Sequence, residues 1–405
     1  MVTHRDFVVH LSRKPRIAGL LSAFVGAGAN VIGVSDVGVR LVGGRPDPAV
    51  LKRAESSSNR PRQTKTGLTL KRLFLTLQYR WGEAVLKRNP EAGLVVWNGI
   101  KGHRSLLTHA AQQMGREVFF FEESPIPKRV AIDREGVNFG SSLPRDPAFY
   151  LAWLRTSGVS PHAWRKIVDD IVPRCSESRD DVKHDAAPDC LEDETFIFCP
   201  LQVPGDSQIS VFGDWIESVD HMIDALKTAS ESLPEGWHLR IKEHPSAKVS
   251  FGEKLAALEG AKFRVDNTTN TMQQVELSQA VLNVNSSVGL QAFFFDKPVI
   301  VMGWSFYGFS DLAIKVDGPA DLASTLSAPE HLSYNKRHRN AFMSYLCEAY
   351  YPAEQDVLAG RYGLDDVRKR DLERDRILAA LPQPDYSRNS SASTPNKAAF
   401  GAQPR

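Results

Sequence analysis

The sequence predicts an α/β protein made of two doubly wound parallel sheets, and three observations support this prediction. Short apolar runs alternate with segments of helical spacing in the first half of the chain, and the same alternation restarts at Thr195. Such alternation is typical of parallel sheets built from βαβ units. The chain has 405 residues, which exceeds the usual size of one domain. We therefore expect two Rossmann-like domains that face a cleft.

The first domain is expected over residues 1–190. Apolar runs predict strands at 7–11, 29–34, 94–97 and 117–121. Helical spacing predicts helices over 17–25 and 105–114. The basic residues before the first of these helices mimic a signal peptide, but a strand precedes them and another follows, so strand–helix–strand is the better interpretation. The Ser/Arg/Lys-rich stretch from Lys52 to Lys71 predicts a mobile loop.

The second domain is expected over residues 191–350, after a charged connection at 176–194. Strands are predicted at 195–199, 238–242, 280–284 and 298–302, and helices at 215–229, 255–258 and 288–295. Charged helices are expected over 354–381, within a terminal segment at 351–382. The Ser/Pro/Asn-rich tail at 383–405 is expected to be disordered.

The composition excludes several classes of protein. Fifty basic and 48 acidic side chains leave a net charge of +2, whereas a dedicated nucleic-acid binder needs a marked basic excess. The four cysteines form no CxxC pair, so neither a zinc site nor a disulfide framework is indicated, and a reducing compartment fits. No apolar run approaches the ~18 residues of a membrane helix. We expect a cytoplasmic protein, in peripheral contact at most with the inner face of the cytoplasmic membrane.

Nucleotide and metal motifs are also missing. The sequence has no P-loop, no complete dinucleotide fingerprint, no HExxH and no nucleophile elbow. It also lacks the Asp-x-Asp pair that carries a metal ion in many glycosyltransferases of the GT-A type. We therefore expect chemistry without a metal or a cofactor.

The strand expected at 238–242 ends in the tetrapeptide Lys242-Glu243-His244-Pro245. Ligands of an open parallel sheet bind at the carboxyl ends of its strands, which makes this a favoured position. Proline fixes the turn, and His244 can donate hydrogen bonds to a phosphate or a ribose hydroxyl. The alternative is a loop histidine whose hydrogen bonds are satisfied within the protein.

A second polar group, Asn285-Ser286-Ser287, lies between an expected strand and an expected helix. Asn and Ser are favoured N-cap residues, so a simple helix cap is one interpretation. Backbone N–H groups and two hydroxyls at a helix start also form an anion site. Together with the His-Pro strand end, this group suggests a cradle for a nucleotide phosphate.

Two further loops carry carboxylates at expected strand ends. Asp206 and Gln208 follow the strand at 195–199, where Asp206 could be a general base, a nucleophile or a turn former. Glu122 and Glu123 follow the strand at 117–121, and the carboxylates Asp133 and Glu135 lie close behind them. This cluster suggests acid/base work or binding of an acceptor hydroxyl, and a solvated turn is the alternative. Arg145 could meet an anionic substrate or pair with Asp146.

Taken together, these motifs resemble the capsular polysaccharide biosynthesis proteins, the bacterial retaining β-Kdo transferases. The motifs that carry the resemblance are Trp97-Asn98-Gly99, Phe121-Glu122, Gly136-Val137-Asn138, Pro144-Arg145-Asp146, Leu201-Gln202, Asp206-Ser207-Gln208, Lys242 with His244-Pro245, and Ser286-Ser287. They extend over residues 94–150 and 196–301. The resemblance implies the GT-B arrangement, in which two Rossmann-like domains enclose the substrates.

The resemblance also implies a reaction and a set of roles. The donor would be CMP-β-Kdo, the acceptor a lipid or a glycan, and transfer would retain the anomeric configuration. Asp206 would be the nucleophile and Glu122 a candidate acid/base. The donor would be held by Gln202, Lys242, His244, Pro245, Asn285, Ser286 and Ser287, and the acceptor or sugar by Glu123, Asn138, Arg145 and Gln208. Lys242, Arg145 or backbone amides would offset the negative charge, because both the nucleophile and the sugar are anionic.

One departure from the family and two other readings of the motifs remain. Ser124 stands where the family has glycine, which puts the acceptor side in doubt. A lipid acceptor would suit the basic stretch at 52–72 near an anionic membrane, although a solvated loop explains that stretch equally well. Polyol-phosphate transfer from a CDP-polyol, as in teichoic-acid polymerases, uses similar motifs, but those enzymes carry Asp-Tyr-Ser-Ser where this chain has Val284-Asn285-Ser286-Ser287. A non-catalytic capsule-assembly protein is the third reading.

Overall fold

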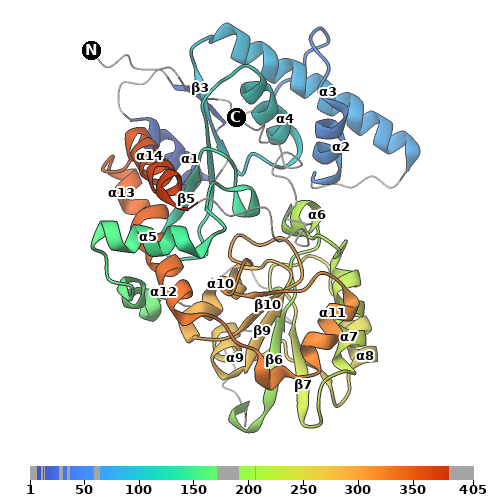
Figure 1. The fold of residues 1–405 in the computed structure, drawn as a ribbon. Coiled ribbons are helices and arrows are strands. Elements are labelled where there is room, and N and C mark those ends of the chain that lie inside the picture. The colour runs from blue at the N-terminus through green and yellow to red at the C-terminus, as the bar shows by residue number, and fades with distance from the viewer. Residues whose placement is uncertain are drawn as a thin grey trace.

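The computed structural model describes residues 7–10, 12, 14–26, 31–33, 37–58, 64–170, 191–205 and 207–382. Two sheets organise this part of the chain, one in the upper half of Figure 1 and one in the lower half. The expected α/β class is confirmed. The charged connection at 176–190 and the tail at 383–405 lie outside the described residues, and the expected domain limits stay a prediction.

The first sheet has the strand order β2-β1-β3-β4-β5. Its strands are β1 (Phe7–His10), β2 (Val31–Gly33), β3 (Gly93–Trp97), β4 (Val118–Glu123) and β5 (Val130–Asp133). The first four are parallel, with Phe7 paired to Gly93 and Leu94 to Val118, and β5 is antiparallel to β4. Strand order therefore reverses between β1 and β3, as in flavodoxin-like sheets, and ligands bind at such switch points.

Helices cover both faces of the first sheet. They are α1 (Pro15–Val25), α2 (Pro48–Ser56), α3 (Lys65–Arg88) and α4 (Gly102–Gln113), whereas α5 (Pro147–Ser157) packs in a separate core. Alternate strand residues face opposite sides: Val8 and Val96 pack with α2, α3 and α4, whereas Val9 and Val95 pack with α1. The expected strands and the helices near 17–25 and 105–114 are confirmed.

The mobile loop expected at Lys52–Lys71 is wrong for the described residues, because α2 and α3 occupy most of that stretch. Asp47 caps α2 by accepting from the backbone N–H groups of Ala49 and Val50. Thr64 caps α3 by accepting from Gly67. The polar composition of the stretch obscured these caps. Residues 59–63 lie outside the described part.

The second sheet is parallel throughout, with the order β11-β10-β9-β6-β7-β8. Its strands are β6 (Thr195–Pro200), β7 (Trp237–Lys242), β8 (Phe263–Val265), β9 (Ala280–Asn283), β10 (Val299–Val301) and β11 (Ile314–Lys315). Counted from β6, this is the 3-2-1-4-5-6 order of dinucleotide-binding sheets, and the order reverses between β6 and β9. The expected Rossmann-like second domain is confirmed in its strand order.

The helices of the second sheet are α6 (Ser207–Phe212), α7 (Val219–Ser230), α8 (Gly252–Leu258), α9 (Thr271–Leu277), α10 (Ser287–Gln291) and α11 (Pro319–Leu326). The helix expected at 215–229 begins only at Val219, because Ser218 accepts from the backbone N–H of His221 and caps it there. Short turns of 3-10 or π type lie at Asn138–Gly140, Ala163–Asp170, Leu191–Asp193, Ala292–Phe295, Pro329–His331 and Leu346–Tyr350.

The last helices return to the first sheet. They are α12 (Lys336–Tyr345), α13 (Glu354–Leu358) and α14 (Leu364–Ala380), and Figure 1 shows α13 and α14 beside α1. Val357 and Val367 are fully buried in the core that α1 forms with the first sheet. Charged terminal helices were expected over 354–381, and they are present, interrupted near Gly360 at a φ of 68°.

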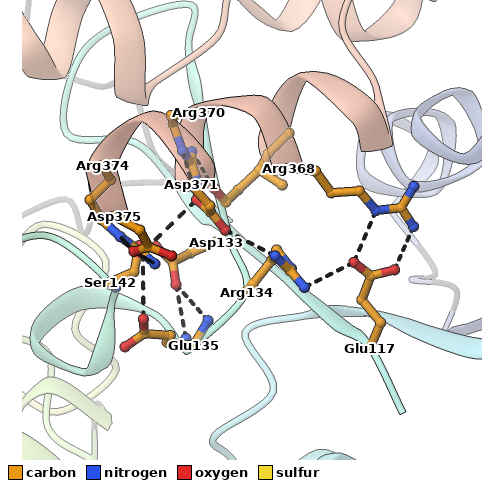
Figure 2. A network of polar contacts seen from close by, with 12 residues as sticks. Glu117, Asp133, Arg134, Glu135, Ser142, Arg368, Arg370, Asp371, Arg374 and Asp375 are labelled. Atoms are coloured by element: carbon orange, nitrogen blue, oxygen red, sulfur yellow. Dashed lines mark hydrogen bonds and ion pairs between the residues drawn. The ribbon is translucent and has the colours of Figure 1, made fainter. Parts of the chain in front are cut away.

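A network of charged side chains joins α14 to the first sheet (Figure 2). Arg370 of α14 donates to the carbonyl of Ile132 in β5 at 2.8 Å and pairs with Asp371 at 3.0 Å. Asp133, which is 2% exposed, accepts from the hydroxyls of Ser142 and Tyr350 at 2.6 and 2.7 Å. Arg368 reaches Glu117 at the start of β4.

None of the helices in the described residues is long and apolar enough to cross a membrane.

Candidate active site

Two loops meet where strand order reverses in the second sheet. One leaves β6 and carries Gln202, and the other leaves β9 and carries Asn285. The Gln202 Nε2 donates to the Asn285 Oδ1 at 2.9 Å, and the backbone N–H of Asn285 donates back to the Gln202 Oε1 at 3.4 Å. Both side chains are buried, at 6% exposure each. The pair therefore fixes the two loops to each other at the switch point.

Asn285 also holds the helix that follows β6. Its Nδ2 donates to the carbonyls of Gln208 and Phe212 at 2.8 and 3.0 Å. The Asn285 side-chain nitrogen therefore donates to α6 while its oxygen accepts from Gln202. These bonds together fix the positions of the loop after β6 and of α6.

An Asn285→Asp variant is expected to lose about 2–4 kcal/mol of unfolding free energy, because a carboxylate would face carbonyl oxygens that lose their donor in a buried site. Urea unfolding followed by circular dichroism would measure this loss. The control is Asn270→Asp, because Asn270 accepts from Met272 and Gln273 as the N-cap of α9. Aspartate serves equally well as an N-cap. Equal stability of both variants would contradict the role of Asn285.

Ser286 and Ser287 begin α10 at the same sheet edge. The Ser286 Oγ accepts from the backbone N–H of Val288 at 3.3 Å, and the backbone N–H of Ser286 donates to the Asn283 Oδ1 at 2.7 Å. Tyr307 donates to the same Asn283 oxygen at 3.0 Å. Ser287 is exposed and Ser286 half-buried. Ser286 is therefore a cap, as one of the two interpretations expected, and both serines line the cavity described below.

His244 follows β7 at the neighbouring strand end. Its Nδ1 accepts from the backbone N–H of Ser246 at 3.1 Å. This contact assigns the proton of the neutral ring to Nε2. His244 therefore presents an N–H donor when neutral, which suits a phosphate oxygen or a sugar hydroxyl.

The opposite wall comes from the first sheet. Glu122 is the penultimate residue of β4, and its carboxylate accepts from the Asn98 Nδ2 and from the backbone N–H of Glu123. Asn98 follows β3 with a φ of 65°, a conformation that asparagine tolerates. Glu123 makes two bonds to the Arg16 guanidinium, at 2.9 and 3.1 Å. The carboxyl ends of β3 and β4 thus bring a fixed carboxylate to the cavity.

A cavity of about 350 Å³ joins these two walls. Of the residues expected at a site, it is lined by Glu122, Glu123, Asn138, Gln202, Gln208, His244, Asn285, Ser286 and Ser287. The first three belong to the first half of the chain and the others to the second. Residues predicted at the carboxyl ends of strands therefore line one cavity, although they lie far apart in the sequence.

Three expected residues do not line this cavity. Lys242 is 2% exposed, and its Nζ donates to the carbonyl of Thr269 at 2.8 Å. Burial lowers its pKa to about 8. Arg145 lies over the Phe139 ring at 3.8 Å and donates to the Phe139 carbonyl. Pro245 serves the turn after His244. Asp206 lies outside the described residues.

Lys101 and Arg104, near the start of α4, line the cavity and were not among the expected residues. The Lys101 Nζ donates to the carbonyl of Gly205 at 3.3 Å, which links the two halves of the chain. Burial lowers the pKa of Arg104, and the charge of Glu122 opposes this shift. These side chains supply the positive charge that was expected from Lys242 and Arg145. The sequence could have indicated both residues, because they follow the strand that ends at Trp97.

The two sheets, with nucleotide-binding strand orders and a shared polar cavity at their carboxyl edges, define the GT-B class of fold. Residues 175–319 match the family model described as capsule polysaccharide biosynthesis protein. This match confirms the resemblance to that family that was expected from the sequence.

Similar proteins include Protein FixF of Sinorhizobium fredii, 29% identical over 67% of this chain and 61% of its own length. Capsule polysaccharide export protein KpsS of Escherichia coli is 22% identical over 50% of this chain and 64% of its length. The chain thus spans less than two thirds of these relatives. Among solved structures, the β-Kdo 2,7 transferase of Thermosulfurimonas dismutans KpsC is 13% identical with a TM-score of 0.46, over 88% of this chain and 98% of that one.

Proposed function

We propose that this protein transfers a sugar from a CMP-activated donor, with CMP-Kdo as the donor that fits the family, to a lipid or glycan acceptor of a surface polysaccharide. One observation carries the proposal. The His244 imidazole and the Ser286 and Ser287 hydroxyls line one cavity with Glu122 of the opposite sheet. A donor phosphate and an acceptor hydroxyl can therefore be held together.

On this proposal the second sheet holds the nucleotide. The Nε2 donor of His244 and the hydroxyls at the start of α10 would bind the phosphate that leaves with CMP. Fixed donors stabilise such a leaving anion without protonating it. Gln202 and Asn285 would support the donor site indirectly, because their side chains hydrogen-bond within the protein and fix the loops that line the cavity.

The chemistry proposed is a double displacement. The Asp206 carboxylate would attack the anomeric carbon as the bond to the CMP phosphate breaks, and an acceptor hydroxyl would then displace Asp206. Glu122 would take the proton of that hydroxyl. Two N–H groups, from Asn98 and Glu123, donate to the Glu122 carboxylate and hold it in place at the cavity. Lys101 and Arg104 would offset the charges of the sugar carboxylate and the nucleophile.

The acceptor would enter from the side of α3 and α4. A second cavity of about 680 Å³ lies there, lined in part by Leu70, Phe74, Lys101 and Arg104. It shares Lys101 and Arg104 with the central cavity. Its mixture of apolar and cationic side chains suits a lipid-linked acceptor with a charged head. Contact with a membrane is part of this proposal.

The test is release of CMP by the purified protein from CMP-Kdo and from CDP-glycerol. We expect release from CMP-Kdo, dependent on an added acceptor, and its loss in His244→Ala. Release from CDP-glycerol alone would favour polyol-phosphate transfer instead. Thermal stabilisation by CMP without turnover of either donor would favour a non-catalytic protein.

A Glu122→Gln variant is expected to transfer sugar about 10²-fold more slowly, because the amide cannot take the proton of the acceptor hydroxyl. The KM for the donor should stay near the wild-type value, since Glu122 lies on the wall opposite His244. The control is Glu354→Gln, which changes a nearby carboxylate that binds Arg16 and does not line the cavity. Unchanged turnover in Glu122→Gln would remove Glu122 from this role.

A further inference from the structure

A groove lies between α5 and the start of α12, which pack against each other (Figure 1). The rings of Tyr150 and Tyr345 meet edge to face between the two helices, with centroids 5.5 Å apart. The Ser344 Oγ donates to the carbonyl of Ser160 at 3.1 Å and fixes the loop after α5 against α12. The groove has a volume of about 500 Å³, and the residues that line it differ from those of the central cavity. Its walls are therefore preformed at a place separate from the candidate active site.

Asn340 lines this groove with an amide that has no partner in the described part of the chain. The residue is 7% exposed, and neither its side-chain oxygen nor its side-chain nitrogen makes a hydrogen bond to the other described residues. Buried side-chain amides are normally hydrogen-bonded, and an unmet one destabilises the protein. The Asn340 amide is therefore available to a molecule in the groove.

Two arginines of the groove have no acidic partner. Arg155 lies in the last turn of α5 and Arg337 in the first turn of α12, and both are exposed. Within the described residues, neither side chain makes an ion pair or a hydrogen bond. The sequence has no carboxylate from 147 to 168 or from 336 to 345. Nothing on α5 or α12 therefore offsets these two charges.

The position of Arg337 opposes the usual charge preference of a helix. α12 begins with Lys336 and Arg337, and its first turn has no acidic residue. The N-terminus of a helix carries partial positive charge, so acids stabilise it and cations do not. Asn335 already caps α12 by accepting from the backbone N–H groups of Arg337 and His338, both at 3.1 Å. Because the Arg337 side chain does not serve the helix, binding of an anion explains its position better.

The remaining walls of the groove are apolar. Leu151, Leu154 and Val159 line it, and they are half-buried against the core that contains residues of α12. A concave site of a few hundred Å³ with apolar walls and a few polar groups has the size and character of a small-molecule site. A protein partner would need a much larger surface.

We propose that this groove binds a small, soluble amphipathic anion, a molecule with an anionic head on a short apolar chain. The guanidinium groups of Arg155 and Arg337 bind the head through charge-assisted hydrogen bonds. The Asn340 amide donates to an oxygen of the ligand, and the apolar walls contact the chain. The site is separate from His244 and Glu122, so binding here and donor turnover can fail independently.

The test is isothermal titration of the full chain with octyl phosphate as the probe, and with inorganic phosphate and octan-1-ol in separate titrations. We expect octyl phosphate to bind at one site. Each of the other two should bind at least about tenfold more weakly, because one lacks the apolar chain and the other the charged head. An affinity for phosphate or octanol equal to that for octyl phosphate would overturn the proposal.

Two variants should change stability and binding in opposite directions. Asn340→Leu keeps the size of the side chain and removes an unmet amide, so the melting temperature should rise by about 2 °C. Its affinity for octyl phosphate should fall about tenfold. Arg337→Glu places an acid at the start of α12, which should also raise the melting temperature, while the affinity falls about a hundredfold. A purely structural role of these residues would lower the melting temperature instead.

The control is Arg376→Gln, which removes an exposed cation of α14 and should bind octyl phosphate like wild type. CMP release should stay at the wild-type rate in all three variants, since none of the changed residues lines the central cavity. Unchanged affinity in Asn340→Leu and Arg337→Glu, or equal loss in the control, would overturn the proposal. Failure of CMP release in the wild type would count against the proposed transferase and leave this site unaffected.

Discussion

Asp206→Asn should bind CMP as tightly as wild type and transfer sugar at least about 10⁴-fold more slowly, the order of loss that removal of a catalytic nucleophile causes. The amide keeps the size of the side chain but cannot attack the anomeric carbon. The described neighbours support the assignment: Gly205 accepts from Lys101, and Gln208 lines the cavity. Isothermal titration with CMP and a CMP-release assay would separate binding from chemistry.

The control for this variant is Asp214→Asn. Asp214 pairs with Lys315 at 2.9 Å, lies away from the cavity lining and has a φ of 58°, which asparagine also adopts. It should keep wild-type turnover. Retained turnover in Asp206→Asn would refute the double displacement, whereas lost CMP binding would show that the change disturbs the donor site.

Arg370→Met is expected to cost about 3 kcal/mol of unfolding free energy or more, because it removes a buried cation from beside two buried carboxylates. Arg370 is 7% exposed, and it sits beside Asp371 and near Asp133, at 3% and 2% exposure. Its loss also removes the donor to the carbonyl of Ile132. Urea unfolding at neutral pH would measure the change.

The control pair lies at the surface. Arg361→Met removes an even shorter pair with Asp356, at 2.5 Å, but the Arg361 side chain is 62% exposed. Exposed pairs contribute at most about 1 kcal/mol. Equal losses of unfolding free energy in the two variants would show that burial does not set the contribution of the Figure 2 network to stability.

The effect of Arg370 should depend on pH. Burial would raise the pKa of Asp133, but Arg370 and the hydroxyls of Ser142 and Tyr350 hold it below the usual value. A depressed folded-state pKa stabilises the protein above the unfolded pKa of about 3.9 and loses that contribution as pH falls. Without Arg370, burial raises the pKa of Asp133, so the deficit of the variant should shrink in acid. A constant deficit from pH 7 to pH 4 would contradict this.

Much of the fold could be predicted because buried parallel strands read as apolar runs. The strands near 94–97, 195–199 and 280–284 all have this form, and the polar residues that follow them line the cavity. The α2–α3 region was missed because its polar stripes dominate the composition, while the caps Asp47 and Thr64 are single residues.

Side-chain direction could not be predicted in the same way. Lys242 ends a strand at the favoured edge, yet it points to Thr269 because its position in β7 faces the interior. Arg145 is held against Phe139 by a contact that depends on the path of a loop. Lys101 and Arg104 reach the cavity only because α4 places them toward the second sheet. Sequence spacing can place a residue at the edge of a sheet, but the packing of neighbouring side chains decides in which direction its charged group points.

The return of α13 and α14 to the first sheet makes that folding unit discontinuous in the chain. During synthesis, the charge of Asp133 would be balanced by Arg370 only after more than two hundred further residues have been added. Contacts of such long sequence separation slow folding. The second sheet, continuous in sequence, can form while the first is still incomplete, and α14 would then complete the core of the first sheet.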